Sequence, residues 1–383
     1  MPSVPHVSLR SDIKTDVLII GAGVSGALLA ETLSTDHQVV VIDRRGPVKG
    51  STAASTALVE YEIDTPLVQL TRKIGRRDAE RAWRRSYVAV SGLGARTRAL
   101  GIKCDLERHD SLYLAGTTLD ADGLREEWKA RRAIGIETGF LSRSASKERF
   151  GISRSAALLA YDDLSLDPRR LAGGYLRAAL VKGARVFCPV DATEVETTSR
   201  SVMVKTAEGP VIAASHVVYC TGYELPDFVP STGHRLGSTY AFATGPQSRR
   251  LWPERCLIWE ASDPYLYIRD TPDGRLICGG EDEDFADAET RDALISSKLK
   301  TLTAKLAKLL PEVDTRPEFA WAGTFGSSDT GLPSIGRIPT TKNCLAVLGF
   351  GGNGITYSRI AADIIGAALG GRADPDADLY DFA

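Results

Sequence analysis

The feature that most constrains the fold is a glycine-rich turn near the N-terminus, GAGVSG at residues 21–26. The apolar run DVLII precedes this turn, and VSGALLAETLS, which has helical spacing, overlaps its end. The next segment, QVVVID, is short, β-branched and ends at Asp43. This order predicts a strand, a helix and a second, parallel strand. Because parallel strands need helices on their faces, we expect an α/β fold with a buried sheet.

The glycines of this turn have the spacing G-x-G-x-x-G, which is typical of dinucleotide-binding sites. The first permits a tight turn, the second lets a pyrophosphate approach the backbone, and the third lets the helix pack closely. The helix N-terminus supplies N–H groups for phosphates. The pattern predicts nucleotide contacts by Gly21, Gly23, Val24, Ser25, Gly26, Asp43 and Arg44. It does not distinguish NAD from FAD.

Length and composition indicate a globular protein of two domains. The chain has 383 residues, which exceeds the usual size of a single domain. Because its net charge is only −2, we expect neither nucleic acid nor a membrane as a partner. The N-terminal sequence has no apolar signal segment, so we expect a cytoplasmic protein.

The six cysteines are far apart, and no two of them form a C-x-x-C pair. Most lie in apolar or strand-like stretches such as RVFCPV and VVYCTG. We therefore expect buried, reduced thiols rather than a zinc site or a redox disulfide, and no metal site.

Several further segments have a pattern that predicts helices or nucleotide contacts. A helix is expected over 167–183, with Asp167 as its N-cap, Pro168 at its first position and Gly183 after its end, and one long charged helix is expected at about 286–310. The run GSTAAST at 50–56 is consistent with a helix start or with hydroxyl and backbone donors facing a ligand. The strand HVVYCTG ends in Thr221 and Gly222, and GLPSIG and GFGGNGITYS follow near the C-terminus.

Together these motifs resemble the FAD-dependent oxidoreductases of the D-amino-acid oxidase type, which include glycine, sarcosine and glutamylputrescine oxidases. The resemblance extends from residue 16 to about residue 370 and is thin from 66 to 141. It implies that Ser51, Thr52, Ala53, Ser55 and Thr56 lie along the pyrophosphate and the flavin. It also implies that the backbone of Val190 holds the adenine, with further contacts from Thr221, Gly222 and Gly336. The C-terminal loop then offers backbone N–H groups to the flavin ring, from Gly351, Gly352, Asn353, Gly354, Ile355 and Thr356.

The family resemblance implies an α/β protein of two interleaved domains. One is a Rossmann-like FAD-binding domain of the glutathione-reductase type, which we place at 1–78, 142–224 and 326–383. The other is a substrate domain built on an antiparallel or mixed β-sheet with helices, which we place at 79–141 and 225–325.

The implied reaction is oxidation of a C–N bond of an amine or amino acid. Hydride transfer to flavin N5 gives an imine, which water hydrolyses. Family members that oxidise amino acids carry an arginine for the substrate carboxylate where this chain has Phe325. That difference favours an amine or N-substituted substrate. No cysteine lies where some members bind the flavin covalently, so we expect noncovalent FAD.

The segment PYLYIRD offers other candidates for the substrate pocket. In a strand, Tyr265, Tyr267 and Arg269 share one face, where two phenols and a guanidinium would bind a carboxylate or a polar substrate. The same pattern is equally typical of an exposed strand face.

Three other functions share parts of this pattern. A pyridine-nucleotide disulfide reductase would need a second dinucleotide motif and a C-x-x-C, and the chain has neither. A dehydrogenase of a non-amine substrate that uses an acceptor other than oxygen, and a non-catalytic FAD-binding protein, both remain open.

Overall fold

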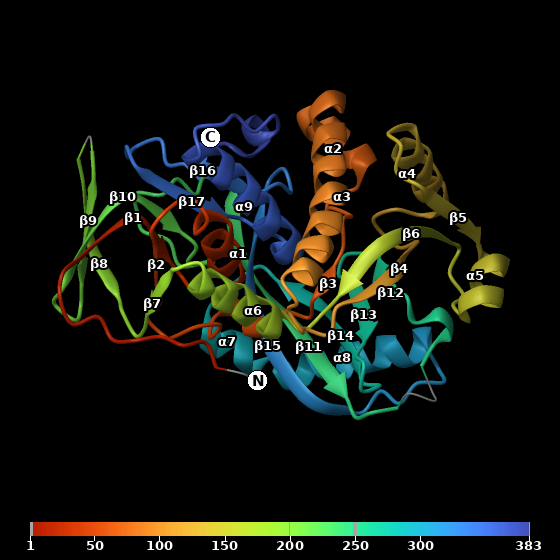
Figure 1. The fold of residues 1–383 in the computed structure, drawn as a ribbon. Helices are drawn as coiled ribbons and strands as arrows, with labels where there is room; N and C mark the ends of the chain where they lie inside the picture. The colour runs from red at the N-terminus through yellow and green to blue at the C-terminus, as the bar shows by residue number, and fades with distance from the viewer. Residues whose placement is uncertain (1–2, 199, 248–250, 383) are drawn as a thin grey trace.

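The structure is a computed structural model that describes residues 3–198, 200–247 and 251–382. Among these residues the strands form two sheets, which lie side by side in Figure 1. The predicted domain ranges also include residues 1, 2, 199, 248–250 and 383, which lie outside the described residues.

The first sheet has the predicted βαβ unit at its centre. Its main strand order is β16-β17-β10-β1-β2-β7, with the β8–β9 hairpin joined to β10. The strands next to β1 are parallel to it, as the motif predicted. The bounds are β1 (Ile13–Ile20), β2 (Val39–Ile42), β7 (Arg185–Phe187), β8 (Ala192–Thr197), β9 (Val202–Thr206), β10 (Val211–Tyr219), β16 (Ser334–Arg337) and β17 (Cys344–Leu348).

Alternate residues of β1 face opposite sides of this sheet. Val17 and Ile19 belong to the core beneath the helices, whereas Leu18 and Ile20 belong to the core on the other face. The helices that cover the first core are α1 (Val24–Leu33), α6 (Pro168–Val181) and α9 (Gly354–Leu369), which lie close together in Figure 1. The buried parallel sheet that the glycine motif predicted is therefore confirmed.

The second sheet has the order β15-β11-β14-β13-β12-β4-β6-β3, with β5 joined to β6. Most of its neighbouring strands are antiparallel, while β4 and β12 are parallel, so the sheet is mixed as expected. The bounds are β3 (Leu58–Val59), β4 (Glu107–Leu114), β5 (Thr138–Ser142), β6 (Ala156–Ser165), β11 (His234–Thr244), β12 (Leu257–Glu260), β13 (Leu266–Asp270), β14 (Leu276–Glu283) and β15 (Pro317–Ser328).

The remaining helices pack around the second sheet or join the two sheets. The long helix α3 contacts both α9 and β6, and so spans the junction. The bounds are α2 (Leu67–Ile74), α3 (Arg76–Ala99), α4 (Ala121–Ala133), α5 (Arg143–Phe150), α7 (Ala288–Ala293) and α8 (Ile295–Leu309), with 3₁₀ turns η1 (Ser51–Ala53), η3 (Pro253–Arg255) and η4 (Ala377–Tyr380). No helix among the described residues combines the length and the apolar character that crossing a membrane would need.

Local signals predicted the helix ends well. The Asp167 side chain accepts hydrogen bonds from the first-turn N–H groups of α6, Pro168 is its first residue, and Gly183 has a φ of +96° just beyond its end. The single helix expected at about 286–310 is wrong, because α7 and α8 are separate. They meet at Leu294, a partly buried residue that packs against the core of the second sheet.

Strands β3 and β6 belong to the second sheet, although the predicted domain ranges placed their residues in the FAD-binding domain. Residues 58–59 and 156–165 were placed with the FAD-binding domain, yet β3 and β6 pair with each other in the second sheet. The correction has a plain physical reason, since the partner of a strand depends on residues about a hundred positions away. Strand sequence alone carries no such information.

Alanine at Gly26 tests the close packing of α1 on the glycine turn. A Cβ at Gly26 would lie 1.9 Å from the carbonyl oxygen of Gly21, whereas a Cβ at Gly92 in α3 would meet nothing within 4 Å. We expect G26A to lower the thermal midpoint by several degrees, since overpacking costs about 1–3 kcal/mol. G92A is the matched control and should be neutral or slightly stabilising. Equal midpoints for the two variants would contradict this packing.

Candidate functional site

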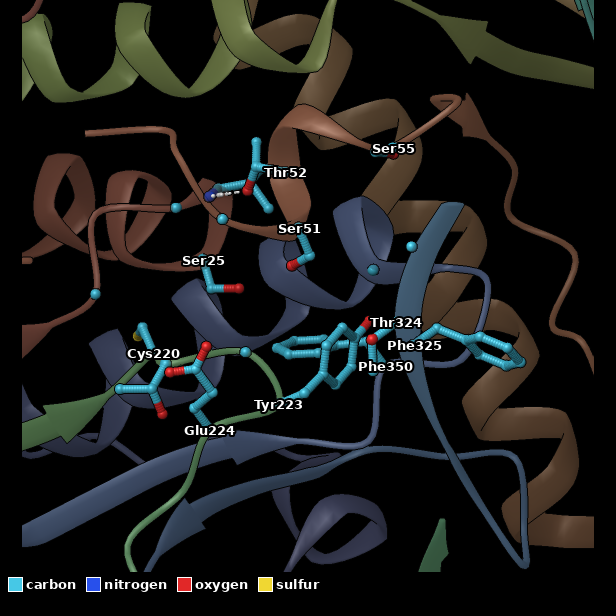
Figure 2. Close-up of a pocket in the computed structure, with 18 of the residues that line it drawn as sticks. Ser25, Ser51, Thr52, Ser55, Cys220, Tyr223, Glu224, Thr324, Phe325 and Phe350 are labelled. Carbon is cyan, nitrogen blue, oxygen red and sulfur yellow. Dashed lines mark hydrogen bonds between the residues drawn. The ribbon is translucent and has the colours of Figure 1, made fainter. Parts of the chain in front are cut away.

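A cavity of about 820 Å³ extends along the junction of the two sheets. Its lining comes from the turn after β1, from η1, from the chain that follows β10, from β13 and β15, and from the N-terminus of α9. Figure 2 shows Ser25, Ser51 and Thr52 on one side, opposite Cys220, Tyr223 and Glu224. Segments from both ends of the chain and from its middle therefore meet at one site.

The glycine turn is held so that little beyond glycine fits. Gly21 has a φ of +112°, and a Cβ there would lie 2.3 Å from the carbonyl oxygen of Cys220. A Cβ at Gly23 would lie 3.1 Å from Oγ1 of Thr52. That hydroxyl oxygen accepts a hydrogen bond of 3.0 Å from the backbone N–H of Val24, drawn as a dashed line in Figure 2. The turn thus keeps its backbone open toward the cavity.

Asp43 lies at the same end of the cavity and is fixed by three backbone N–H groups. Its carboxylate accepts hydrogen bonds from Ala22 (2.9 Å), Arg45 (2.8 Å) and Gly46 (2.9 Å). Next to it, the guanidinium of Arg44 forms an ion pair with Glu224 across the cavity. This acid therefore has a defined orientation at the end of the cavity where the glycine motif predicts the nucleotide.

The small residues at 50–56 form a surface of the cavity rather than a capped helix. Ser51–Ala53 is a 3₁₀ turn without a side-chain hydrogen bond at its N-cap. Four of the predicted residues line the cavity, namely Ser51, Thr52, Ser55 and Thr56. Ala53 does not, although it belongs to the same turn. Of the two interpretations, the structure therefore favours hydroxyl groups that face a ligand.

The loop before α9 differs in one respect from its predicted role. The N–H of Gly351 donates to the carbonyl of Gly326 and the N–H of Gly352 donates to a carboxylate oxygen of Asp64, both at 2.6 Å. These two amides are used within the protein, so they do not face the ring as we expected. The first N–H groups of a helix have no acceptor inside it, and those of Gly354 and Ile355 belong to residues that line the cavity.

Asn353 and Thr356 connect this loop to the segment 60–64. The side-chain amide of Asn353 donates to the carbonyls of Glu60 (3.2 Å) and Glu62 (2.8 Å), and the Thr356 hydroxyl donates to the carbonyl of Glu60 (2.9 Å). Thr356 is buried and does not line the cavity, so its role is to hold the segment rather than to contact a ligand.

The segment 60–64 places three acids on the cavity wall, at Glu60, Glu62 and Asp64. Glu62 is fully engaged, because it forms a 2.6 Å ion pair with Arg131 and accepts a 2.8 Å hydrogen bond from Ser111. Arg131 also pairs with Glu127 at 2.8 Å, and both side chains are completely buried. We did not single out these acids from the sequence, although their alternation with apolar residues in VEYEID is a usable signal.

The part of the cavity lined by Glu60, Asp64, Trp259, Tyr265 and Tyr267 is called the inner chamber below. Burial together with the charges of Glu62 and Asp64 raises the pKa of Glu60. Burial also raises the pKa of Asp64, against the effect of its hydrogen bond from Gly352. Asp64 is an exposed residue that lines the cavity. Acidic and aromatic groups thus form one wall.

Of the four predicted pocket residues, Tyr265, Tyr267 and Phe325 line the cavity. Arg269 does not line the cavity, so the prediction that it binds the substrate is wrong. Its guanidinium donates to the carbonyls of Thr56, Asp270 and Leu166. The side chain is buried where residues near η1 and α6 pack over the end of β13, and burial lowers its pKa to about 10. Arg269 therefore stabilises the junction of the two sheets.

Most of the predicted nucleotide residues line the cavity, including Val24, Ser25, Val190, Thr221 and Gly222. Gly26 and Gly336 do not. Gly26 packs on the turn, while Gly336 lies within β16 with a φ of +141°. Lining residues that we missed are Tyr223, Glu224, Trp259, Thr324 and Phe350, which have no distinctive pattern in the sequence. All six cysteines are buried and free, as predicted.

The residues present fit a dinucleotide cofactor. Gly21 and Gly23 line the cavity next to a helix N-terminus, which favours phosphate. The hydroxyl oxygen of Thr221 lines the cavity and is buried without a hydrogen-bond partner in the described structure. A second helix N-terminus, that of α9, lies at the far end.

These features define a dinucleotide-binding protein whose site lies between two sheets, and comparison with known proteins gives its family. The model of the FAD-dependent oxidoreductase family DAO matches residues 16–368. The chain belongs to this family, and its cofactor is FAD.

Relatives with known functions are distant. Gamma-glutamylputrescine oxidoreductase of Escherichia coli is 23% identical over 384 residues, covering 97% of this chain and 87% of its own length. Glycine oxidase of Bacillus subtilis is 24% identical over 371 residues, covering 91% of each chain. The crystal structure of glycine oxidase from Geobacillus kaustophilus matches with a TM-score of 0.78 at 19% identity, covering 94% of this chain and 96% of the other. At such identity the structural match supports the fold.

Replacing Arg131 tests the buried ion network beneath the cavity wall. R131M leaves Glu62 and Glu127 buried without their shared partner. We expect a loss of about 3–5 kcal/mol in the free energy of unfolding, measured by denaturant titration. The control is K129M, which removes an exposed charge from the same helix. A similar stability for both variants would show that the network contributes little.

The pH dependence of stability tests the environment of Asp282, beside Tyr265. Burial raises the pKa of this carboxyl from 3.8 to about 6. The folded protein then holds the proton more tightly than the unfolded chain does, so stability falls as pH rises from about 4 to about 6. We expect the thermal midpoint of wild type to fall relative to that of D282N as the pH rises across this interval. Above it, the difference between the two midpoints should be constant. Parallel profiles would contradict the raised pKa.

Proposed function

We propose that this protein oxidises the C–N bond of an amine or amino acid to an imine, which water hydrolyses to a carbonyl compound and an amine. When bound, FAD accepts the hydride from the carbon next to the nitrogen. The substrate is a small molecule. A cytoplasmic location stays a prediction.

The observation that carries the proposal is the composition of the inner chamber. It lies beyond the N-terminus of α9 and combines two carboxyl groups with three aromatic rings. Among the described residues that line the whole cavity, the cationic side chains are Arg44 and Arg45, and both face Glu224 at the other end. A wall of this kind favours an amine over a substrate whose main feature is a free carboxylate.

The side chains of this cavity have roles that follow from their positions. The first N–H groups of α9 and its dipole stabilise negative charge that develops at the ring. Tyr265 and Tyr267 give the chamber an aromatic wall that excludes water and orients the substrate carbon chain. Phe325 lies where an arginine would hold a carboxylate in family members that oxidise amino acids. The two relatives named for an amine and for an amino acid as substrates support the same reaction class.

An anaerobic titration of the purified protein tests this function. The flavin absorbance should bleach on addition of a member of a panel of primary and secondary amines and D- and L-amino acids, with amines more effective. Readmission of air then shows whether oxygen restores the absorbance. Acid precipitation should release FAD into solution if it is bound noncovalently.

Two outcomes would favour the alternatives. If the protein binds FAD fully and a hydroxy acid or alcohol bleaches it while amines do not, the protein is a dehydrogenase of another substrate class. If no compound bleaches it, a non-catalytic role is favoured.

A further inference from the structure

Among the described residues, Glu60 is an acid of the inner chamber with a buried carboxyl oxygen that has no hydrogen-bond partner. Glu62 is paired with Arg131 and Ser111, and Asp64 accepts the N–H of Gly352. Oε1 of Glu60 is buried and has no hydrogen-bond partner among the residues that the structure describes, although Glu60 lines the cavity. Only 9% of this residue is exposed. Burial of the charged form is costly, which raises the pKa of Glu60 and favours the neutral carboxyl in the empty cavity. A cation bound next to Glu60 would favour the carboxylate again.

Other acidic side chains lie close to Glu60. Asp163 is completely buried behind it; one oxygen accepts the N–H of Tyr61 at 3.0 Å, and Oδ2 has no partner in the described part of the chain. Oxygen atoms of Glu60, Glu62 and Asp163 lie within 4.8 Å of one another. Arg131 offers one positive charge to this group and shares it with Glu127. The local balance therefore lacks positive charge.

The aromatic wall of the inner chamber suits the same kind of ligand. The charge of Asp64 acts on both Glu60 and Tyr265, which shows that these groups lie in one electrostatic environment. The rings of Tyr265 and Tyr267 are 5.8 Å apart, and Trp259 stacks on Tyr113 at 3.8 Å. Aromatic faces beside carboxylates attract ammonium groups.

We propose that Glu60 is a specificity-determining residue that binds a second ammonium group of the substrate, so that the substrate is a diamine or longer polyamine. This inference rests on the proposed function, because it assigns the substrate class of the same site. One nitrogen is next to the carbon that is oxidised, and the other is held by Glu60 between the aromatic rings.

A divalent metal ion fits this site less well. Mg²⁺ takes six oxygen ligands, several of them waters, and Ca²⁺ takes six to eight, so either ion needs room for water beside the carboxylates. Oε1 of Glu60 and Oδ2 of Asp163 are buried atoms, which leaves little such room. Both oxygens of Glu62 are already engaged by Arg131 and Ser111, so Glu60 and a single oxygen of Asp163 remain. An ammonium group needs only one or two acceptors, which is what the chamber offers.

The first experiment measures binding without turnover, in the FAD-loaded protein. Its probes are a straight-chain bis(trimethylammonium) alkane and the matching alkyl trimethylammonium, which has one charge fewer. Neither has a nitrogen lone pair, so neither can be oxidised to an imine. Binding is followed by the change in flavin absorbance. We expect the doubly charged probe to bind wild type about tenfold or more tightly than the singly charged probe.

The variants assign that preference to Glu60. E60Q should abolish the advantage of the second charge, while E126Q, which removes an exposed carboxylate on α4, should retain it. Retention of the advantage in E60Q, or its absence in wild type, would overturn the proposal. Glu60-dependent binding of Mg²⁺ alone, measured by calorimetry, would also overturn it in favour of a metal site.

A conservative variant guards against a folding defect. If E60Q fails to retain FAD, E60D keeps the charge and moves it back by one methylene. It should then shift the preferred diamine to a longer chain, whereas an unchanged length preference would contradict the anchoring role.

A parallel anaerobic reduction with a diamine and the monoamine of equal length separates the two proposals. If an amine reduces the flavin but E60Q does not alter the preference for the diamine, the inference about Glu60 fails and the proposed function stands. If the charged probes bind through Glu60 while no amine reduces the flavin, the binding site stands and the proposed function fails.

Discussion

The hydrogen bonds between Asn353 and the carbonyls of Glu60 and Glu62 support the whole arrangement of the cavity. They join residues that are almost three hundred positions apart, and they connect the start of α9 with the segment that follows β3 of the second sheet. Together with the hydrogen bonds from Thr356 to Glu60 and from Gly352 to Asp64, they fix the acids of segment 60–64 relative to the α9 N-terminus. The site therefore depends on a contact between chain segments rather than on either segment alone.

The two buried arginines near the cavity show how charge is distributed in this fold. Arg131 compensates two buried glutamates, and Arg269 is held by three backbone carbonyls. Each satisfies groups that folding has removed from water, which is the condition for keeping a charge inside a protein. Neither lines the cavity. The negative charge of the inner chamber therefore has no cationic side chain in its wall to balance it, and a cationic substrate would provide that balance.

The features of the fold that could be predicted from the sequence are those that depend on residues close together in the chain. The glycine turn, the cap at Asp167 and the parallel pairing of β1 with β2 were correct, because each depends on residues close in the chain. The sheet membership of β3 and β6 was not, since their pairing is between distant segments. The same reasoning applies to the site. Motifs identified residues such as Gly23 that line the nucleotide end, whereas the direction of Arg269 depends on Thr56 and Leu166, which no local pattern connects to it.

A crystal structure of the FAD-loaded protein would test the central claim most directly, since that claim concerns which end of the cavity holds which part of the cofactor. We expect the ADP half against Gly21, Gly23 and Asp43, and the flavin ring at the first turn of α9 with one face toward the inner chamber. A ring placed away from Gly354 and Ile355, or one that leaves Glu60 and Tyr265 out of reach of a substrate on its face, would contradict the account.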